Sequence, residues 1–329
     1  MKPVYYSDYL QLDKILNAQA LESDKHNKHA HDEMLFVIIH QTYELWFKQL
    51  LYEVESVSGI FAQKEINDNS PDLQIAVHRL ERCCTILGVL VQQIDVMETM
   101  TPMDFLDFRD LLRPASGFQS IQFKFLEALL GLKFEHRHGQ NYYTSQLTPE
   151  DVAKVKELEQ RKTLLELVNG WLERMPYFNH ENLWTEYRSI YASSLQEAEL
   201  NNLEQFDKRF FSTEKNSDMA LSRDASRSAL FIILYRHYPL LHLPYELIKT
   251  LLTIDELLGQ WRFRHINMVQ RIIGSRTGTG GSTGTGYLQA ALNKHYIFKD
   301  FASLTGFLIE RNKLPKLNLD IVNKMGFEQ

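Results

Sequence analysis

The chain has 329 residues, of which 44% are hydrophobic and 24% charged, and its formal net charge is −6. This is the composition of a globular protein with a substantial core, and the acidic balance argues against a nucleic-acid-binding function. No apolar run is long enough to span a bilayer, and no charged-then-apolar signal opens the chain, so we expect no membrane association and a cytoplasmic location.

The N-terminal part of the chain predicts a short amphipathic segment followed by a long helix. Residues 5–20 carry the amphipathic pattern, and the polar stretch 22–30 predicts a loop. A helix from about residue 32 to 54 has apolar residues at steps of three or four. This spacing places His40 on the same face as Phe36 and other aromatic residues.

The next two helices supply a core element and a candidate binding group. Residues 73–94 carry the longest regular apolar pattern in the chain. Thr101 and Pro102 then predict the start of a helix, because threonine is a common cap and proline is favoured in the first turn. One side of this helix holds Arg109 beside Phe105 and a second phenylalanine. Such an arginine either pairs with an acidic residue or binds an anionic ligand.

The remainder of the chain also predicts helices, with a weaker and more aromatic pattern between residues 177 and 216. The other helices are predicted over residues 118–130, 148–173, 218–238, 244–273, 287–294 and 298–311. No β alternation, repeat or linker interrupts these patterns. We therefore predict an all-α fold with a single large helical-bundle domain over residues 1–329 and a helical excursion at about residues 140–215.

The segment from residue 244 to residue 286 predicts a ligand site. His265 lies on the apolar stripe of the predicted helix, four residues after Trp261, so its side chain is expected to point inward. Residues 274–286 then consist almost wholly of glycine, serine and threonine and hold six of the chain's 15 glycines. A buried histidine followed by such a segment suggests a site with a mobile polar cover.

Several other motifs match a functional pattern by spacing, but their predicted surroundings do not suit that function. The Gly280–Gly284 stretch matches the spacing of a hydrolase nucleophile elbow, which needs a preceding strand, whereas a helix is predicted here. The histidines of the polar stretches 26–31 and 136–138 are expected to be solvated rather than metal-bound. Each of His40 and His265 alone is more often a core residue. Together they permit a haem pocket with an axial and a distal histidine, held non-covalently because no Cys-x-x-Cys-His motif is present.

Five long blocks of the sequence resemble the tryptophan 2,3-dioxygenase family, and they occur in family order over most of the chain. The blocks are His31–Lys48, Phe105–Asp110, Pro114–Ser120, Trp261–His265 and Arg276–Ser282. The resemblance implies a helical, homotetrameric enzyme that binds haem b. It also implies that the enzyme cleaves the indole C2–C3 bond of L-tryptophan with O2, giving N-formylkynurenine. A related haem oxygenase for modified indoles, or a non-catalytic haem or tryptophan sensor, remains an alternative.

The resemblance also implies roles for individual residues. His265 is similar to the family's proximal iron ligand, and His40 to the distal histidine that accepts the indole N–H. Arg109 resembles the arginine that binds the substrate carboxylate, and Thr279 the threonine that helps to hold the ammonium and carboxylate groups. Phe105 stands where some bacterial members carry tyrosine, which puts a hydroxyl contact to the substrate in doubt.

Further residues match positions around the substrate and the haem. Phe36 matches the lining of the indole pocket. Three residues match the haem surroundings, and three match an N-terminal segment, within residues 1–20, that reaches the neighbouring subunit's site. The haem residues are Ser116, Gly117 and Trp261, and the N-terminal residues are Tyr6, Tyr9 and Leu10.

Overall fold

The computed structural model describes residues 3–63, 66, 70–132, 144–175, 179–213, 219–274, 276 and 296–325. All regular elements in this part of the chain are helices, and no strand is found among these residues. The predicted all-α fold is confirmed.

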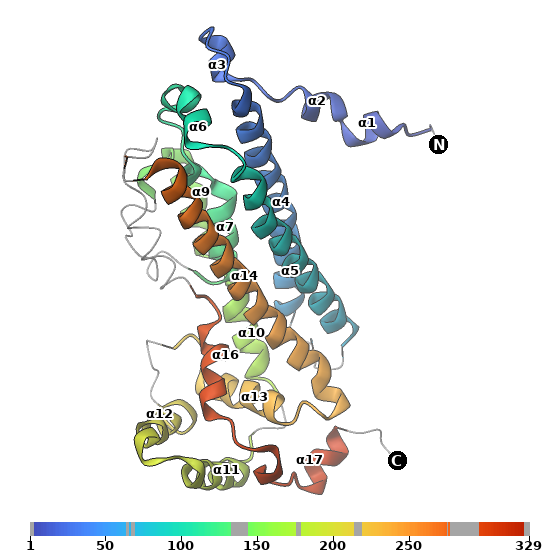
Figure 1. The fold of residues 1–329 in the computed structure, drawn as a ribbon. Coiled ribbons are helices and arrows are strands. Elements are labelled where there is room, and N and C mark those ends of the chain that lie inside the picture. The colour runs from blue at the N-terminus through green and yellow to red at the C-terminus, as the bar shows by residue number, and fades with distance from the viewer. Residues whose placement is uncertain are drawn as a thin grey trace.

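Three long helices run side by side through the centre of the molecule (Figure 1). They are α4 (His31–Phe61), α5 (Pro71–Met97) and α14 (His242–Ile273). α5 packs against both of the others. α4 extends beyond its predicted end at residue 54, because Val57, Ile60 and Phe61 continue the buried apolar spacing.

Short elements gather at the end of the bundle where α14 ends (Figure 1). They are α3 (Glu22–Lys25), α6 (Pro102–Arg109), η1 (Asp110–Leu112), η2 (Gly117–Gln119) and α7 (Ile121–Leu130). α6 begins at the predicted cap, where Thr101 and Asp104 form a capping box. α3 replaces part of the predicted loop, since the Glu33 carboxylate accepts hydrogen bonds from the backbone N–H groups of Glu22 and Ser23.

The helix predicted over residues 148–173 is instead two helices. The Thr163 hydroxyl accepts a hydrogen bond from the Glu166 N–H, and the Glu166 carboxylate accepts one from the Thr163 N–H, so a new helix starts there. The elements of this part of the chain are α9 (Pro149–Glu159), α10 (Leu164–Leu172), α11 (Glu181–Ser194), η4 (Glu197–Glu199), α12 (Asn201–Phe210), α13 (Arg223–Leu234) and η5 (Pro239–Leu241).

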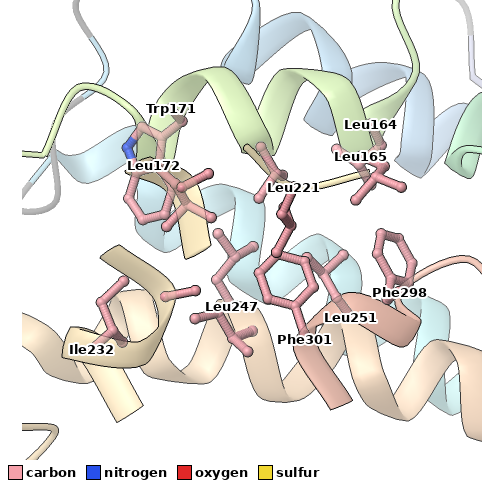
Figure 2. Packing of buried hydrophobic residues seen from close by; sticks show 14 of the residues in the cluster. Leu164, Leu165, Trp171, Leu172, Leu221, Ile232, Leu247, Leu251, Phe298 and Phe301 are labelled. Carbon is pink, nitrogen blue, oxygen red and sulfur yellow. The ribbon is translucent and has the colours of Figure 1, made fainter. Parts of the chain in front are cut away.

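The main core joins elements that are far apart in the sequence. Figure 2 shows Trp171 and Leu172 of α10 beside Ile232 of α13 and Leu247 of α14, with Phe301 packed nearby. Helices of the middle of the chain and of its C-terminal part therefore bury their apolar faces against the same helix, α14.

The C-terminal part of the chain forms four short helices, of which the first two replace the longer helix predicted over residues 298–311. They are α16 (Lys299–Ser303), η6 (Leu304–Phe307), η7 (Arg311–Lys313) and α17 (Leu319–Lys324). The helix predicted over residues 287–294 lies outside the described residues.

The N-terminal elements α1 (Tyr6–Leu10) and α2 (Leu12–Leu16) extend away from the bundle (Figure 1). Neither helix has a buried residue. Among the described helices, none is by itself long and apolar enough to cross a membrane. Only α5 taken together with α6 and η1 reaches that length and apolar character, and this pair is bent by 90°.

Candidate active site

A small hydrophobic cluster, separate from the main core, forms where α4, α5 and α6 meet. We call it the pocket cluster, and its buried members are Ala30, Ile39, Met97, Met100, Phe105 and Phe108. Met268 and Ile272, near the end of α14, pack against it. The pocket cluster therefore brings the helix that carries His265 next to the helices that carry His40 and Arg109.

Four aromatic side chains stand together at this cluster, two from α4 and two from α6. The Phe36 ring lies 4.2 Å from the His40 ring and 5.7 Å from the Phe105 ring, measured between centroids. Phe108 meets Phe36 edge-on at 5.6 Å. One histidine thus borders a wall of phenylalanine rings, which suits a flat apolar ligand with one polar edge.

The tautomer of His40 is set by its own helix. Its Nδ1 lies 2.7 Å from the Phe36 carbonyl oxygen, and because a carbonyl only accepts, Nδ1 carries the proton. Part of the ring reaches solvent while protein packs densely around the rest, and this burial lowers the pKa of His40. The neutral ring therefore offers Nε2 as a hydrogen-bond acceptor.

His265 projects from α14 and stacks on Trp261. The two rings are 5.1 Å apart and inclined by only 3°. The buried Nδ1 of His265 makes no hydrogen bond within the described part of the chain. Burial, and then the nearby His40 charge, lower the pKa of His265 to about 4. The imidazole is therefore neutral at pH 7, and the two histidines lie near one another.

Aromatic residues of α4 and α7 hold the Trp261 ring in place. Phe123 lies 5.0 Å from it and Tyr43 lies 6.2 Å from it. The Tyr43 hydroxyl donates a hydrogen bond to the Leu90 carbonyl, and burial raises its pKa to about 12. Stacking on a ring that is itself packed on two sides restricts the orientation of the His265 imidazole.

Arg109 is the last residue of α6, and it is only 5% exposed. It follows directly after the fully buried Phe108, a member of the pocket cluster. A cation at a helix C-terminus is also favoured by the helix dipole. The planar guanidinium of a buried arginine is well suited to bind a carboxylate.

Comparison with known proteins identifies the family of this chain. A family model described as tryptophan 2,3-dioxygenase matches residues 1–308. The chain is 43% identical to the tryptophan 2,3-dioxygenase of Alteromonas mediterranea, covering 99% of this chain and 98% of that protein. It is 40% identical to that of Bdellovibrio bacteriovorus, with the same coverage. It is 39% identical to that of Rattus norvegicus, covering 95% of this chain and 84% of that protein. The chain belongs to the tryptophan 2,3-dioxygenase family.

The site residues expected for the tryptophan 2,3-dioxygenase family are only partly assembled within one chain. Phe36, His40 and Phe105 contact one another through Phe36, and His265 stacks on Trp261. The remaining residues lie elsewhere or outside the described part.

Ser116 and Gly117 lie in the turn between α6 and α7. The Ser116 hydroxyl accepts a hydrogen bond from the Phe118 N–H. A side chain at Gly117 would meet no atom within 4 Å. Open space beside the backbone is compatible with the close approach of a large planar ligand.

The other expected residues are not part of the described pocket. Tyr6, Tyr9 and Leu10 lie on the protruding α1 and are exposed, with Tyr6 at 75%. Thr279 lies outside the described residues. For all of these residues the expected roles stay predictions.

Sequence reasoning missed the polar residues that support α14. Arg262 of α14 directly follows Trp261 in the sequence. It forms an ion pair at 2.7 Å with Glu127 of α7, and both side chains are buried. Asp255 is also buried on α14. Charged residues within an apolar helical stripe were the available signal, because buried charges require partners. In the described part of the chain, no group of three or more metal-ligand side chains is found.

Proposed function

We propose that this protein cleaves the C2–C3 bond of the indole ring of L-tryptophan with O2 and forms N-formylkynurenine, using haem b. The observation that carries the proposal is the pairing of two neutral, neighbouring histidines beside a cluster of phenylalanine rings. Family membership over nearly the whole chain supports the same reaction.

The residues around His265 fit a haem. Its imidazole is neutral, and its buried Nδ1 lacks a protein partner in the described part of the chain, as suits a nitrogen ligand to iron. His265 would hold the haem iron, and Trp261, Ser116 and Gly117 would lie around the haem. When bound, the haem supplies the iron at which O2 is activated.

His40 orients the substrate. With Nδ1–H donated to the Phe36 carbonyl, Nε2 is free to accept the indole N–H. Phe36 and Phe105 would pack against the indole ring, and Phe105 offers no hydroxyl to the substrate. These residues fix the ring and exclude water, and none of them needs to act as a strong base.

The charged end of the substrate needs separate partners. Arg109 would bind the carboxylate through the two parallel hydrogen bonds that a guanidinium can make. Thr279 would bind the ammonium and carboxylate groups. Tryptophan is then recognised at its indole N–H, its ring faces and its charged end, which distinguishes it from a free indole.

We further propose that the protein assembles as a homotetramer and that Tyr6, Tyr9 and Leu10 reach a neighbouring subunit's site. Exposed apolar residues support this proposal. The N-terminal segment carries a run of them that the described part of the chain leaves exposed: Val4, Tyr5, Tyr6, Tyr9, Leu10, Ile15 and Leu16. A second set repeats at intervals of seven along the outer face of α4, at Ile38, Leu45 and Tyr52. Such exposed apolar stripes are typical of protein interfaces.

The test combines a spectrum with a product mass. Protein reconstituted with haemin should show an intense Soret band, and His265→Ala should lose it. His242→Ala, an exposed histidine on the same helix, should keep it. With ¹⁸O₂, the product should carry both labelled oxygen atoms. A product with one added oxygen, or no turnover of L-tryptophan under air, would contradict the proposal.

A further inference from the structure

A cavity of about 500 Å³ lies between α12 and the short elements α16 and η6. We call it the α12 cavity. Its polar lining consists of Asn202, Gln205, Lys208 and Arg209 of α12 and of Lys299, Asp300 and Ser303 of α16. Figure 1 shows α12 and α16 in the half of the molecule away from α6, so this cavity is separate from the candidate active site. A cavity of this size accommodates a small organic molecule.

Arg209 is the buried cation of the α12 cavity, with only 5% of the residue exposed. Its Nε donates a hydrogen bond to the Ser226 hydroxyl at 3.3 Å, Nη1 donates to the Ser303 hydroxyl at 2.6 Å, and Nη2 donates to the Asp300 carbonyl at 3.0 Å. All three acceptors are uncharged. A guanidinium has five N–H groups, so each terminal nitrogen keeps one N–H beyond these three bonds.

The charge of Arg209 is not balanced by an ion pair. Burial lowers the pKa of Arg209, although the charge of Asp300 acts in the opposite direction, and an arginine still keeps its proton at neutral pH. The Oδ2 atom of Asp300 accepts hydrogen bonds from the backbone N–H groups of Ala220 at 2.6 Å and Leu221 at 2.9 Å. In the described part of the chain, Arg209 therefore binds the backbone carbonyl of Asp300 and forms no ion pair with its carboxylate.

Two lysines add positive charge at the same cavity. Lys208 precedes Arg209 on α12, and Lys299 begins α16; both are exposed. Among the described residues, neither lysine forms an ion pair. The lining thus holds three cations and one carboxylate, a balance of +2, in a chain whose formal net charge is −6. A hollow with one dominant sign of charge attracts ions of the opposite sign.

The buried arginine distinguishes this cavity from an ordinary solvated surface. Exposed lysines alone are common and need no ligand, whereas a buried guanidinium without a carboxylate partner is costly. An anion in the cavity would offset that cost by accepting the remaining N–H groups of Arg209. The cation that decides the chemistry is therefore the one that water reaches least.

The charge balance and the donor types favour a phosphate group. A phosphate ester carries a charge of about −1.5 to −2 at pH 7, which matches the balance of +2. Arginine supplies a planar pair of donors and lysine a compact charge, and both are common phosphate ligands. The cavity is larger than a phosphate ion, and the amides of Asn202 and Gln205 offer hydrogen bonds to further polar groups of a ligand.

We propose that the α12 cavity binds a phosphate group, free or carried by a small ester, through Lys208, Arg209 and Lys299. This site lies apart from the tryptophan and haem site and does not depend on the proposed function. A bound phosphate joins α12 to α16, so its binding stabilises the folded chain by mass action.

The experiment titrates phosphate compounds into the haem-loaded protein by calorimetry, in a phosphate-free buffer of low ionic strength. Inorganic phosphate should bind at one site per chain with a dissociation constant of about 1 mM or lower. Glucose 6-phosphate tests the ester: tighter binding than inorganic phosphate identifies an ester as the occupant, and weaker binding identifies the free ion. Succinate, a dicarboxylate, should bind at least about tenfold more weakly than phosphate.

A double variant tests the assigned residues, with a control matched in charge. Lys208→Gln combined with Lys299→Gln should raise the dissociation constant of inorganic phosphate about tenfold, and Tm without phosphate should stay unchanged because both lysines are exposed. Lys25→Gln combined with Lys154→Gln removes the same charge from α3 and α9, at exposed positions, and should leave phosphate binding within about twofold of the wild type.

Three results would overturn the proposal. The first is the absence of saturable binding for both phosphate compounds. The second is succinate binding as tight as that of inorganic phosphate, which would assign the cavity to carboxylates. The third is equal weakening in the two double variants, which would show a general effect of net charge. Arg209 stays intact in both variants, because its hydrogen bonds also hold α12 against α13 and α16.

Discussion

His40 illustrates how a single backbone contact sets the chemistry of a side chain. Its Nδ1–H is donated to the Phe36 carbonyl one turn earlier, and this fixes Nε2 as the acceptor in the neutral ring. The acceptor would be lost if the ring were protonated, since both nitrogens of a charged imidazole are donors. The role proposed for His40 therefore requires a neutral ring at the working pH.

A pH profile tests this requirement. Burial lowers the pKa of His40 below its usual 6.5, so the neutral ring predominates at pH 6.5 and above, and the protonated ring gains population as the pH falls below that value. We expect the KM for L-tryptophan to be constant from pH 6.5 to about pH 8 and to rise as the pH falls further. His40→Ala should lose this acidic rise. A KM that changes with a midpoint above pH 6.5 in the wild type would contradict the assignment.

Arg109 can be tested by removing its charge. Arg109→Leu should lower kcat/KM for L-tryptophan. The decrease should correspond to a loss of about 2 to 4 kcal/mol of transition-state binding, as when one partner of a buried charge pair is removed. Arg113→Leu removes an exposed arginine nearby, which pairs with Asp110 at 3.4 Å, and should change kcat/KM little. The kcat/KM for tryptamine, which lacks the carboxylate, should not change in Arg109→Leu. Unchanged kinetics with L-tryptophan would refute the role.

At the scale of elements, α14 combines core and site in one continuous helix. Its first half packs into the main core through Leu247 and Leu251, and its second half carries Trp261 and His265. Between them, the Arg262–Glu127 ion pair ties α14 to α7. The contacts of the residues that precede His265 on the same helix thus restrict its orientation.

The Arg262–Glu127 pair gives a stability prediction. Glu127→Gln removes the carboxylate charge that faces a buried guanidinium, and the free energy of unfolding should fall by about 3 to 5 kcal/mol. Urea denaturation of the haem-free protein measures this change. Glu127→Leu combined with Arg262→Met should recover most of the loss, because an apolar pair needs no desolvated charge.

The control for this pair is an exposed one. Glu310 pairs with Lys313 at 3.1 Å on the surface, and Glu310→Gln should change the free energy of unfolding by less than about 1 kcal/mol. An equally small change for Glu127→Gln would contradict the predicted contribution of the buried pair to the free energy of unfolding.

The sequence predicts elements of this fold better than contacts between them. α14 was predicted almost to its ends, because its apolar stripe is long and Gly274 ends it. The break before Thr163 was missed, since the apolar spacing runs through it and a local capping box decides the start of α10.

Contacts between distant residues carry less signal in the sequence. Glu127 and Arg262 are 135 residues apart, and no local pattern pairs them. The inward direction of His265 followed from helical spacing, whereas its role as an iron ligand came from the family resemblance. The aromatic wall formed by Phe36 and Phe105 depends on the packing of α4 against α6, which spacing alone does not define.

At the scale of the whole molecule, the N-terminal segment is a long stretch of apolar side chains that the described part of the chain leaves exposed. α1 protrudes from the bundle, with its tyrosines exposed (Figure 1). A protruding apolar segment is stable in water only at a cost, and burying it against another subunit removes that cost. The proposed site is then completed by two chains.

Mixed oligomers test whether two chains share a site. Tyr6→Ser combined with Tyr9→Ser should raise the KM for L-tryptophan about tenfold, as expected when aromatic contacts at an interface are truncated. Arg109→Leu subunits should be weakly active because their own pocket lacks the guanidinium that binds the substrate carboxylate. When the two variants are co-expressed, the intact N-terminal segment of one should serve the intact pocket of the other, and activity should rise above that of either alone. Absence of any rise would argue against a shared site.

The separation of the pocket cluster from the main core has a consequence for local stability. The pocket cluster contains six buried residues and depends on the eight-residue α6, whereas the main core extends along α4, α5 and α14. Regions with few buried contacts open at lower free energy than the global transition. Amide protons of α6 should therefore exchange with solvent faster than those in the middle of α5.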